Sequence, residues 1–200
     1  MLLMGASGAG KSTVRELIAD DLAAEIECVE LGHVVSIRRV PTIAWRQRAT
    51  EAVVQRALAL QAVGRHLLLA GDPVAAGEVI AAPSADKLDA IAVCLLDVTA
   101  EAQAARLTER GDDPRLHPDH RAFADWMRTH ARDPHHMPHV LTTNGWDAMR
   151  WDRLRNIDPS NGEWHIHVLD TSAHAKREVA DEVLIWCRRA LTGQAPPICL

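Results

Sequence analysis

Apolar runs of three to eight residues recur along the chain, each stopped by glycine, proline or a polar cluster. Two of them are almost uninterrupted, which is typical of strands buried on both faces of a parallel sheet. The others are shorter or are broken by polar residues. The predicted strands cover residues 2–4, 27–35, 66–70, 91–98 and 164–169.

Between the strands, apolar residues recur at the three- and four-residue spacing of amphipathic helices. Pro41 suits the first turn of one helix and Gly64 its end, while Thr99 is placed to cap another. Strands alternating with helices imply right-handed crossovers, hence an α/β protein with a mainly parallel five-stranded sheet covered on both faces. The predicted helices cover residues 11–22, 41–63, 77–90, 99–110 and 179–191.

The stretch 111–163 breaks this alternation, because it is rich in Asp, Pro, His, Arg and Trp. A chain of 200 residues suits one domain better than two, so we expect a single core with an insertion. The core is predicted at 1–110 and 164–192, with 111–163 as a lid and a helical insertion on the acceptor side. Residues 193–200 are predicted to form a tail.

Composition removes several classes of protein. The net charge of -5 argues against broad nucleic-acid binding, which depends on Lys and Arg neutralising phosphates. No apolar stretch approaches the roughly 20 residues of a membrane-spanning helix, and the apolar start is too short for a signal peptide. Four widely spaced cysteines without a Cys-x-x-Cys pair favour a reduced, cytoplasmic compartment.

The strongest motif is Gly5-Ala6-Ser7-Gly8-Ala9-Gly10-Lys11-Ser12, which matches the P-loop pattern Gly-x-x-x-x-Gly-Lys-Ser. We call residues 5–10 the glycine loop. Glycines allow successive N–H groups to point inward at phosphates, Lys11 reaches the β- and γ-phosphates, and the Ser12 hydroxyl completes Mg²⁺ coordination. The residues predicted to bind the phosphates are Gly5, Ser7, Gly8, Ala9, Gly10, Lys11, Ser12 and Thr13.

Together with the segments 93–99 and 106–111, this loop resembles the nucleoside and nucleotide kinase-like family of P-loop proteins. Chloramphenicol phosphotransferase, gluconate kinase and the tunicamycin-resistance ATP-binding proteins are similar in size. The resemblance implies a three-layer α/β/α P-loop fold, ATP as donor with Mg²⁺, Arg106 stacking on adenine and Arg110 approaching the phosphates. A planar guanidinium at the edge of a closing lid can also neutralise charge on the transferring group. The alternative is that both arginines are surface residues paired with Glu101, Glu109 or Asp112.

Two acidic residues compete for the acceptor side of the reaction. Asp72 follows the third strand at its carboxyl end, where ligands gather in open α/β sheets, but Gly-Asp-Pro is also a common turn. Glu30, with His33 nearby, lies at the location where related kinases usually place an Asp. Arg38 and Arg39 are candidates for binding an anionic acceptor, or solvated surface residues.

The insertion offers aromatic and imidazole side chains. Trp126, Trp146 and Trp151 are either core residues or an aromatic wall for a ring-bearing acceptor, backed by arginines. A zinc site is a further hypothesis, although prolines interrupt any helix that would align its ligands. The histidines that suggest it are His117, His120, His130, His135, His136 and His139.

These expectations combine into ATP-dependent phosphorylation of a hydroxyl on a small molecule, by a monomer or a homodimer. Two alternatives stay open: an ATP-binding sensor or resistance protein that holds a ligand without phosphorylating it, and a subunit that hydrolyses ATP to drive a partner. Ser12 and Asp72 are the candidate metal ligands. The candidate catalytic residues are Lys11, Glu30, Asp72 and Arg110.

Overall fold

Five parallel strands form one sheet in the computed structural model, which describes residues 1–36 and 42–198. The strand order is β2-β3-β1-β4-β5, and each neighbouring pair is parallel. The predicted α/β class and the number of strands are therefore confirmed. The strands are β1 (Leu2–Met4), β2 (Ile26–Val29), β3 (His66–Ala70), β4 (Val93–Asp97) and β5 (Ile166–Asp170).

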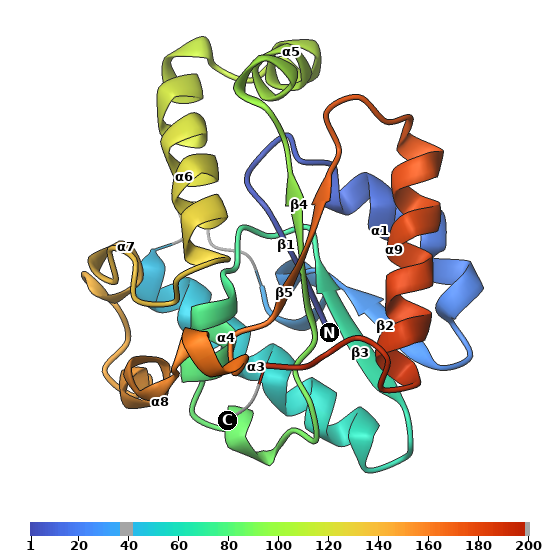
Figure 1. Ribbon diagram of the computed structural model, residues 1–200, viewed down its shortest axis with the longest axis vertical. Coiled ribbons are helices and arrows are strands. Elements are labelled where there is room, and N and C mark those ends of the chain that lie inside the picture. The colour runs from blue at the N-terminus through green and yellow to red at the C-terminus, as the bar shows by residue number, and fades with distance from the viewer. Residues whose placement is uncertain (37–41, 199–200) are drawn as a thin grey trace.

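Helices cover both faces of this sheet, with α1 and α9 on one side and α3 and α4 on the other (Figure 1). The described helices are α1 (Lys11–Leu22), α2 (Leu31–Val34), α3 (Ile43–Gln61), α4 (Ala76–Ala81), α5 (Ala100–Arg110), α6 (His117–His130), α7 (His139–Thr142), α8 (Trp151–Asn156) and α9 (Lys176–Leu191). Short 3-10 turns are η1 (Ala85–Lys87), η2 (Pro114–Leu116) and η3 (Pro159–Asn161). None of these helices has the length and apolar character needed to cross a bilayer.

The strands divide their side chains between two cores. In β1, Leu2 and Met4 pack with α3 and α4, whereas Leu3 packs with α1 and α9. This follows from the alternation of side chains along a strand. Both cores are almost fully apolar, which explains why β3 and β4, which lie between them, read as nearly continuous hydrophobic runs in the sequence.

Two predicted elements were wrong. The strand predicted over 27–35 ends at Val29, because Glu30 and Leu31 start the short helix α2. The helix predicted over 77–90 ends at Ala81, since Pro83 lacks an N–H and its ring obstructs a continuing helix. The predictions made for Pro41, Arg38 and Arg39 lie outside the described residues.

The insertion is helical, and its aromatic residues are partly core. Phe123, Trp126 and His130 stack along α6, with ring centroids 5.5 and 4.7 Å apart. Trp126 is buried, so the core interpretation is confirmed for it. Trp146 instead lies under the guanidinium of Arg48, 5.6 Å from its ring centroid. An aromatic wall for an acceptor stays a prediction.

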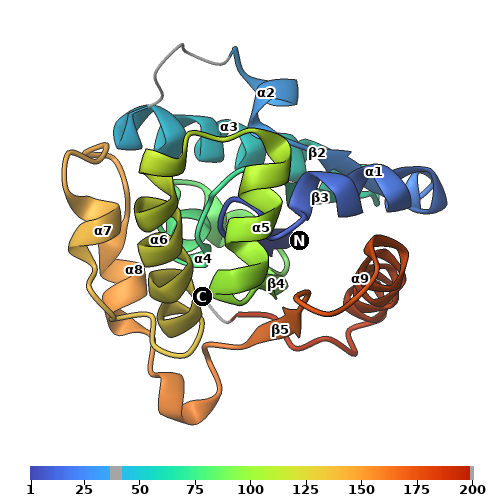
Figure 2. The same cartoon turned by 90° about the horizontal axis from the view of Figure 1, so that it is seen from above.

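Because every strand runs in the same direction, the segments that follow the strands meet at one edge of the sheet. Figure 2 looks down on this edge, with α5 and α6 above it and α2 beside it. The residues that follow β1, β2, β3, β4 and β5 there are Gly5, Glu30, Gly71, Val98 and Thr171.

Candidate nucleotide cleft

The glycine loop joins β1 to α1 and curls at the carboxyl edge of the sheet. Gly5, Gly8 and Gly10 all have positive φ, a backbone region that other residues rarely adopt. α1 begins at Lys11, immediately after the loop. The first N–H groups of a helix have no partner within the helix, so this junction favours a negatively charged ligand.

Lys11 is buried at the centre of the loop, with 5% of its surface exposed. Its Nζ donates to the carbonyl oxygens of Gly5 at 2.7 Å and Ala6 at 3.0 Å. Burial lowers the pKa of Lys11 to about 8, and the nearby Asp72 carboxylate opposes that shift. The side chain is a poorly hydrated ammonium, for which an anionic ligand would restore the lost solvation.

A cleft of about 610 Å³ opens beside this lysine. Its walls are the loop and the start of α1, residues 7–14, the arginines of α5, and the segment 171–176 that leads into α9. Seven of the eight residues predicted to bind phosphate line it; the eighth, Gly5, contributes the carbonyl that holds Lys11. A smaller cavity of about 230 Å³ lies at the opposite edge of the sheet and is lined mainly by apolar residues.

Arg106 forms part of the cleft wall and is fixed by carbonyl groups. Its Nη1 donates to the Gly8 carbonyl at 3.2 Å and to Thr171 Oγ1 at 2.9 Å, while Nη2 donates to the Thr171 carbonyl. Pairing with a surface carboxylate is therefore the wrong interpretation for Arg106. Stacking on adenine stays a prediction.

Arg110 lies one helical turn further along α5 and also lines the cleft. Its Nε donates to Asp112 Oδ1 at 2.7 Å, and 54% of the arginine side chain is exposed. The surface pairing considered for this residue is thus present. The same side chain borders the space beside Lys11, so an approach to a bound phosphate stays a prediction.

Glu30 and Asp72 lie side by side at the ends of β2 and β3. The Glu30 carboxylate passes so close to Gly71 that a Cβ there would lie 2.3 Å from Glu30 Oε1. Glu30 also accepts from Arg15 Nε at 3.2 Å, and its own N–H donates to His33 Nδ1 at 3.2 Å. His33 therefore acts as a local cap in this structure.

Asp72 accepts a hydrogen bond from the Leu31 N–H at 2.6 Å, so its carboxylate is turned toward α2. Burial raises the pKa of Asp72, the Leu31 hydrogen bond opposes this, and the neighbouring Glu30 raises it further. Gly71 and Pro73, on either side of Asp72, line the cleft. Which of the two carboxylates serves as a base stays a prediction.

Sequence reasoning missed two buried polar residues that hold the cleft together. Thr171, 1% exposed, donates through Oγ1 to the Asp97 carbonyl at 3.0 Å, with the Ala9 carbonyl 3.4 Å away. Gln103, 2% exposed, donates through Nε2 to the Ser7 carbonyl at 2.9 Å. The available signal was a polar residue on the apolar face of a predicted helix, or just after a predicted strand.

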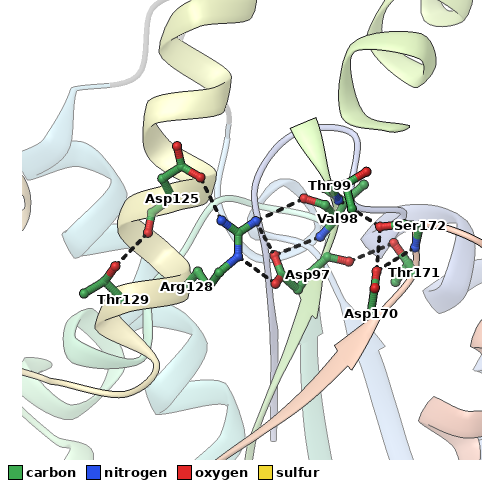
Figure 3. Close-up of polar contacts among 9 residues, drawn as sticks. All are labelled: Asp97, Val98, Thr99, Asp125, Arg128, Thr129, Asp170, Thr171 and Ser172. Carbon is green, nitrogen blue, oxygen red and sulfur yellow. Dashed lines mark hydrogen bonds and ion pairs between the residues drawn. The ribbon is translucent and has the colours of Figure 1, made fainter. Parts of the chain in front are cut away.

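The insertion is tied to the same edge by Arg128 of α6 (Figure 3). Its Nε and Nη2 donate to the two carboxylate oxygens of Asp97 at 2.8 and 2.9 Å, and Nη2 also reaches the Val98 carbonyl. Asp125 accepts from Nη1 at 2.7 Å. These contacts raise the pKa of Arg128, so its charge is permanent, and they fix α6 at the end of β4.

Among residues 1–36 and 42–198, no group of three or more His, Cys, Asp or Glu side chains is arranged to hold a metal ion. The zinc hypothesis for the insertion therefore receives no support. No protein-family model matches the chain, and a search of curated proteins finds no match. The functional interpretation rests on the residues of the cleft.

Proposed function

We propose that this protein is a P-loop phosphotransferase that moves the γ-phosphoryl group of ATP to a hydroxyl of a small molecule. The observation that carries the proposal is the meeting of the glycine loop, Lys11 and two arginines of α5 in one cleft of about 610 Å³. A loop of inward N–H groups with one ammonium suits a chain of phosphates. The two carboxylates at the neighbouring strand ends suit an acceptor hydroxyl.

On the donor side, the loop N–H groups and the start of α1 hold the β- and γ-phosphates. Lys11 neutralises the charge that develops on the equatorial oxygens of the transferring group, and Arg110 leaves Asp112 to do the same from the cleft wall. Arg106 and the segment 171–176 enclose the base and ribose. Enclosure excludes water, which strengthens each of these electrostatic contacts.

In the transfer, the bond between the γ-phosphorus and the bridging oxygen breaks, and that oxygen leaves as part of ADP. A bond forms between the acceptor oxygen and the phosphorus, and the hydroxyl proton passes to Glu30 or Asp72. Burial raises the pKa of Asp72, which favours it over Glu30 as the proton acceptor. Glu30 is already engaged by Arg15.

The donor set also fits Mg²⁺. Magnesium prefers oxygen ligands and is usually held by one or two side chains together with substrate phosphates, rather than by an all-protein cage. Ser12 lines the cleft, and Asp72 lies at the end of the neighbouring strand, so these two would hold it; in that case Glu30 would take the hydroxyl proton. When bound, the ion would neutralise part of the phosphate charge.

The test is acceptor-dependent ADP release with ATP and Mg²⁺ across a panel of nucleosides, sugar-like metabolites and antibiotics. Lys11→Ala should lower the rate by at least about a thousandfold, since it removes the cation at the transferring group. Lys87→Ala is the matched control, because that lysine is exposed in η1 and distant from the cleft in sequence and structure. It should retain the full rate.

Mass spectrometry of the acceptor separates the alternatives. A phosphorylated product supports transfer. Ligand binding that a non-hydrolysable ATP analogue strengthens, with no product, would replace the proposal by a sensor that sequesters its ligand. ADP release that no acceptor changes would favour an ATPase.

A further inference from the structure

Helix α5 holds two successive carbonyl groups of the glycine loop. Gln103 donates to the carbonyl of Ser7 at 2.9 Å, and Arg106 donates to the carbonyl of Gly8 at 3.2 Å. The two side chains are three residues apart, so they project from the same face of the helix. Two loop carbonyls are thereby held against α5, so the helix fixes the orientation of two peptide groups of the loop.

The loop and α5 approach closely at this contact. A Cβ on Gly8 would meet Gln103 Cγ at 3.4 Å and Leu107 Cδ2 at 3.5 Å, which is ordinary packing distance. Gln103 itself is only 2% exposed. A buried amide without partners is costly, so its hydrogen bonds constrain both the helix and the loop.

The same amide nitrogen reaches a third element. Gln103 Nε2 also donates to the carbonyl of His120, in the first turns of α6, at 3.2 Å. One side chain therefore joins the glycine loop to the helical insertion. Both N–H groups of the amide are used, and neither adds charge to the cleft.

We propose that Gln103 is a positioning residue that presets the glycine loop for nucleotide and sets α6 against it. This inference rests on the proposed function, because it assigns the loop to ATP. A loop held open before binding loses less conformational freedom when the phosphates arrive, so the amide raises nucleotide affinity without touching the nucleotide. The hydrogen bond from the same amide to the His120 carbonyl fixes α6, and with it the acceptor-side insertion, relative to the loop.

The test uses Gln103→Glu and isothermal calorimetry with magnesium AMP-PNP at pH 8 and pH 6. The introduced carboxyl faces two carbonyl oxygens. Ionised at pH 8, it repels both and should weaken AMP-PNP binding about tenfold. Protonated, it donates one hydrogen bond, and its burial favours that form, so the deficit should shrink to about threefold at pH 6.

The quantity compared is the ratio of the variant's Kd to the wild-type Kd at each pH. Arg106 and the His120 carbonyl lie beside position 103 in both proteins, so the ratio compares the amide and the carboxyl in the same surroundings. Gln47→Glu is the matched control, because Gln47 is also fully buried and also donates to a carbonyl, that of Leu141 at 2.8 Å, away from the loop. Its ratio should stay near one at both pH values.

A deficit that does not change with pH, or one that Gln47→Glu reproduces, would overturn the inference, as would an unchanged affinity. Should Gln103→Glu fail to fold, Gln103→Met replaces it. That variant keeps the shape and removes both donors, and it should weaken AMP-PNP binding by about tenfold at both pH values. Wild-type affinity from the variant would contradict the inference.

Failure of this inference differs from failure of the proposed function. If Lys11→Ala loses AMP-PNP while both Gln103 variants retain it, only the role of Gln103 is wrong. If wild-type protein does not bind AMP-PNP, the cleft is not a nucleotide site and both fail.

Discussion

At the scale of single residues, the buried amine of Lys11 gives the protein a pH dependence with two opposite signs. Burial lowers its pKa to about 8, whereas the unfolded chain keeps the ordinary value of 10.5. Between these values the unfolded chain binds more protons, so the unfolding free energy of the ligand-free protein rises with pH. Under the proposed function, nucleotide binding needs the charged form of Lys11, so the affinity should weaken over the same range.

We expect the unfolding free energy of wild type, relative to Lys11→Met, to increase by about 2 kcal/mol between pH 7.5 and pH 10. The affinity for AMP-PNP should fall by about fivefold from pH 8 to pH 9, as the charged fraction of Lys11 falls. Urea unfolding and calorimetry measure the two quantities. A wild-type curve parallel to that of the variant would show that Lys11 keeps an ordinary pKa.

Gly71 is a second residue whose replacement should destabilise the protein. It has φ +114, and a Cβ would collide with the Glu30 carboxylate, whereas Gly64 has φ +70 with open space around it. We expect Gly71→Ala to cost about 3 kcal/mol of stability and Gly64→Ala about 1 kcal/mol. Equal costs in chemical denaturation would mean that Glu30 moves aside freely.

At the scale of elements, a buried ion pair joins α3 to α4. Arg46 Nε donates to Glu78 Oε1 at 2.9 Å, and Glu78 is completely buried and also accepts from the Ala75 N–H. Burial raises the pKa of Glu78, and Arg46 opposes that shift. Such a pair adds little net stability, because removing both charges from water costs about as much as their attraction returns.

Arg46→Met should therefore destabilise the protein by about 3 kcal/mol at pH 7, and by less at pH 5. The sign follows from the raised pKa: the buried carboxyl becomes neutral as the pH falls, which removes the unpaired charge. The double variant Arg46→Met/Glu78→Leu should return to within about 1 kcal/mol of wild type. Urea unfolding measures the stability of the single variant at both pH values and of the double variant. A double variant as unstable as the single one would contradict this account.

Elements differ in how far the sequence predicts them. β3 and β4 were predicted well because each is apolar on both sides, and the start of α5 because Thr99 caps it through Ala102 N–H. The end of β2 could not be found from apolar spacing, since it depends on Asp72 accepting from Leu31, a partner 41 residues away. The early end of α4 was signalled by Pro83 and was overlooked.

At the scale of the whole molecule, the residues of the site differ in whether their partners are near or far in the sequence. The glycine loop is local in sequence, so its residues could be predicted as a motif. Gln103 and Thr171 contact carbonyl groups 96 and 162 residues away. Every residue has a backbone carbonyl, so the type of the partner residue does not reveal such a hydrogen bond. Only the fold brings these partners together.

Because the cleft draws on segments distant in sequence, nucleotide binding should stabilise the molecule as a whole. At a concentration 100 times its Kd, AMP-PNP should raise the unfolding free energy by about 2.7 kcal/mol. Hydrogen exchange should slow at the glycine loop, in α5 and at residues 171–176 together. Lys11→Ala should show neither effect, and protection confined to the loop would contradict a cleft shared by all three.

The contact between Thr171 and Ala9 also sets an order of events during synthesis. The ribosome makes the glycine loop 162 residues before the threonine that closes the cleft wall, at a pace of about 5 to 20 residues per second. For roughly the first ten seconds or more, the nascent chain carries a loop with one wall missing. Under the proposed function, ATP can therefore contact the complete cleft only after β5 has joined the sheet.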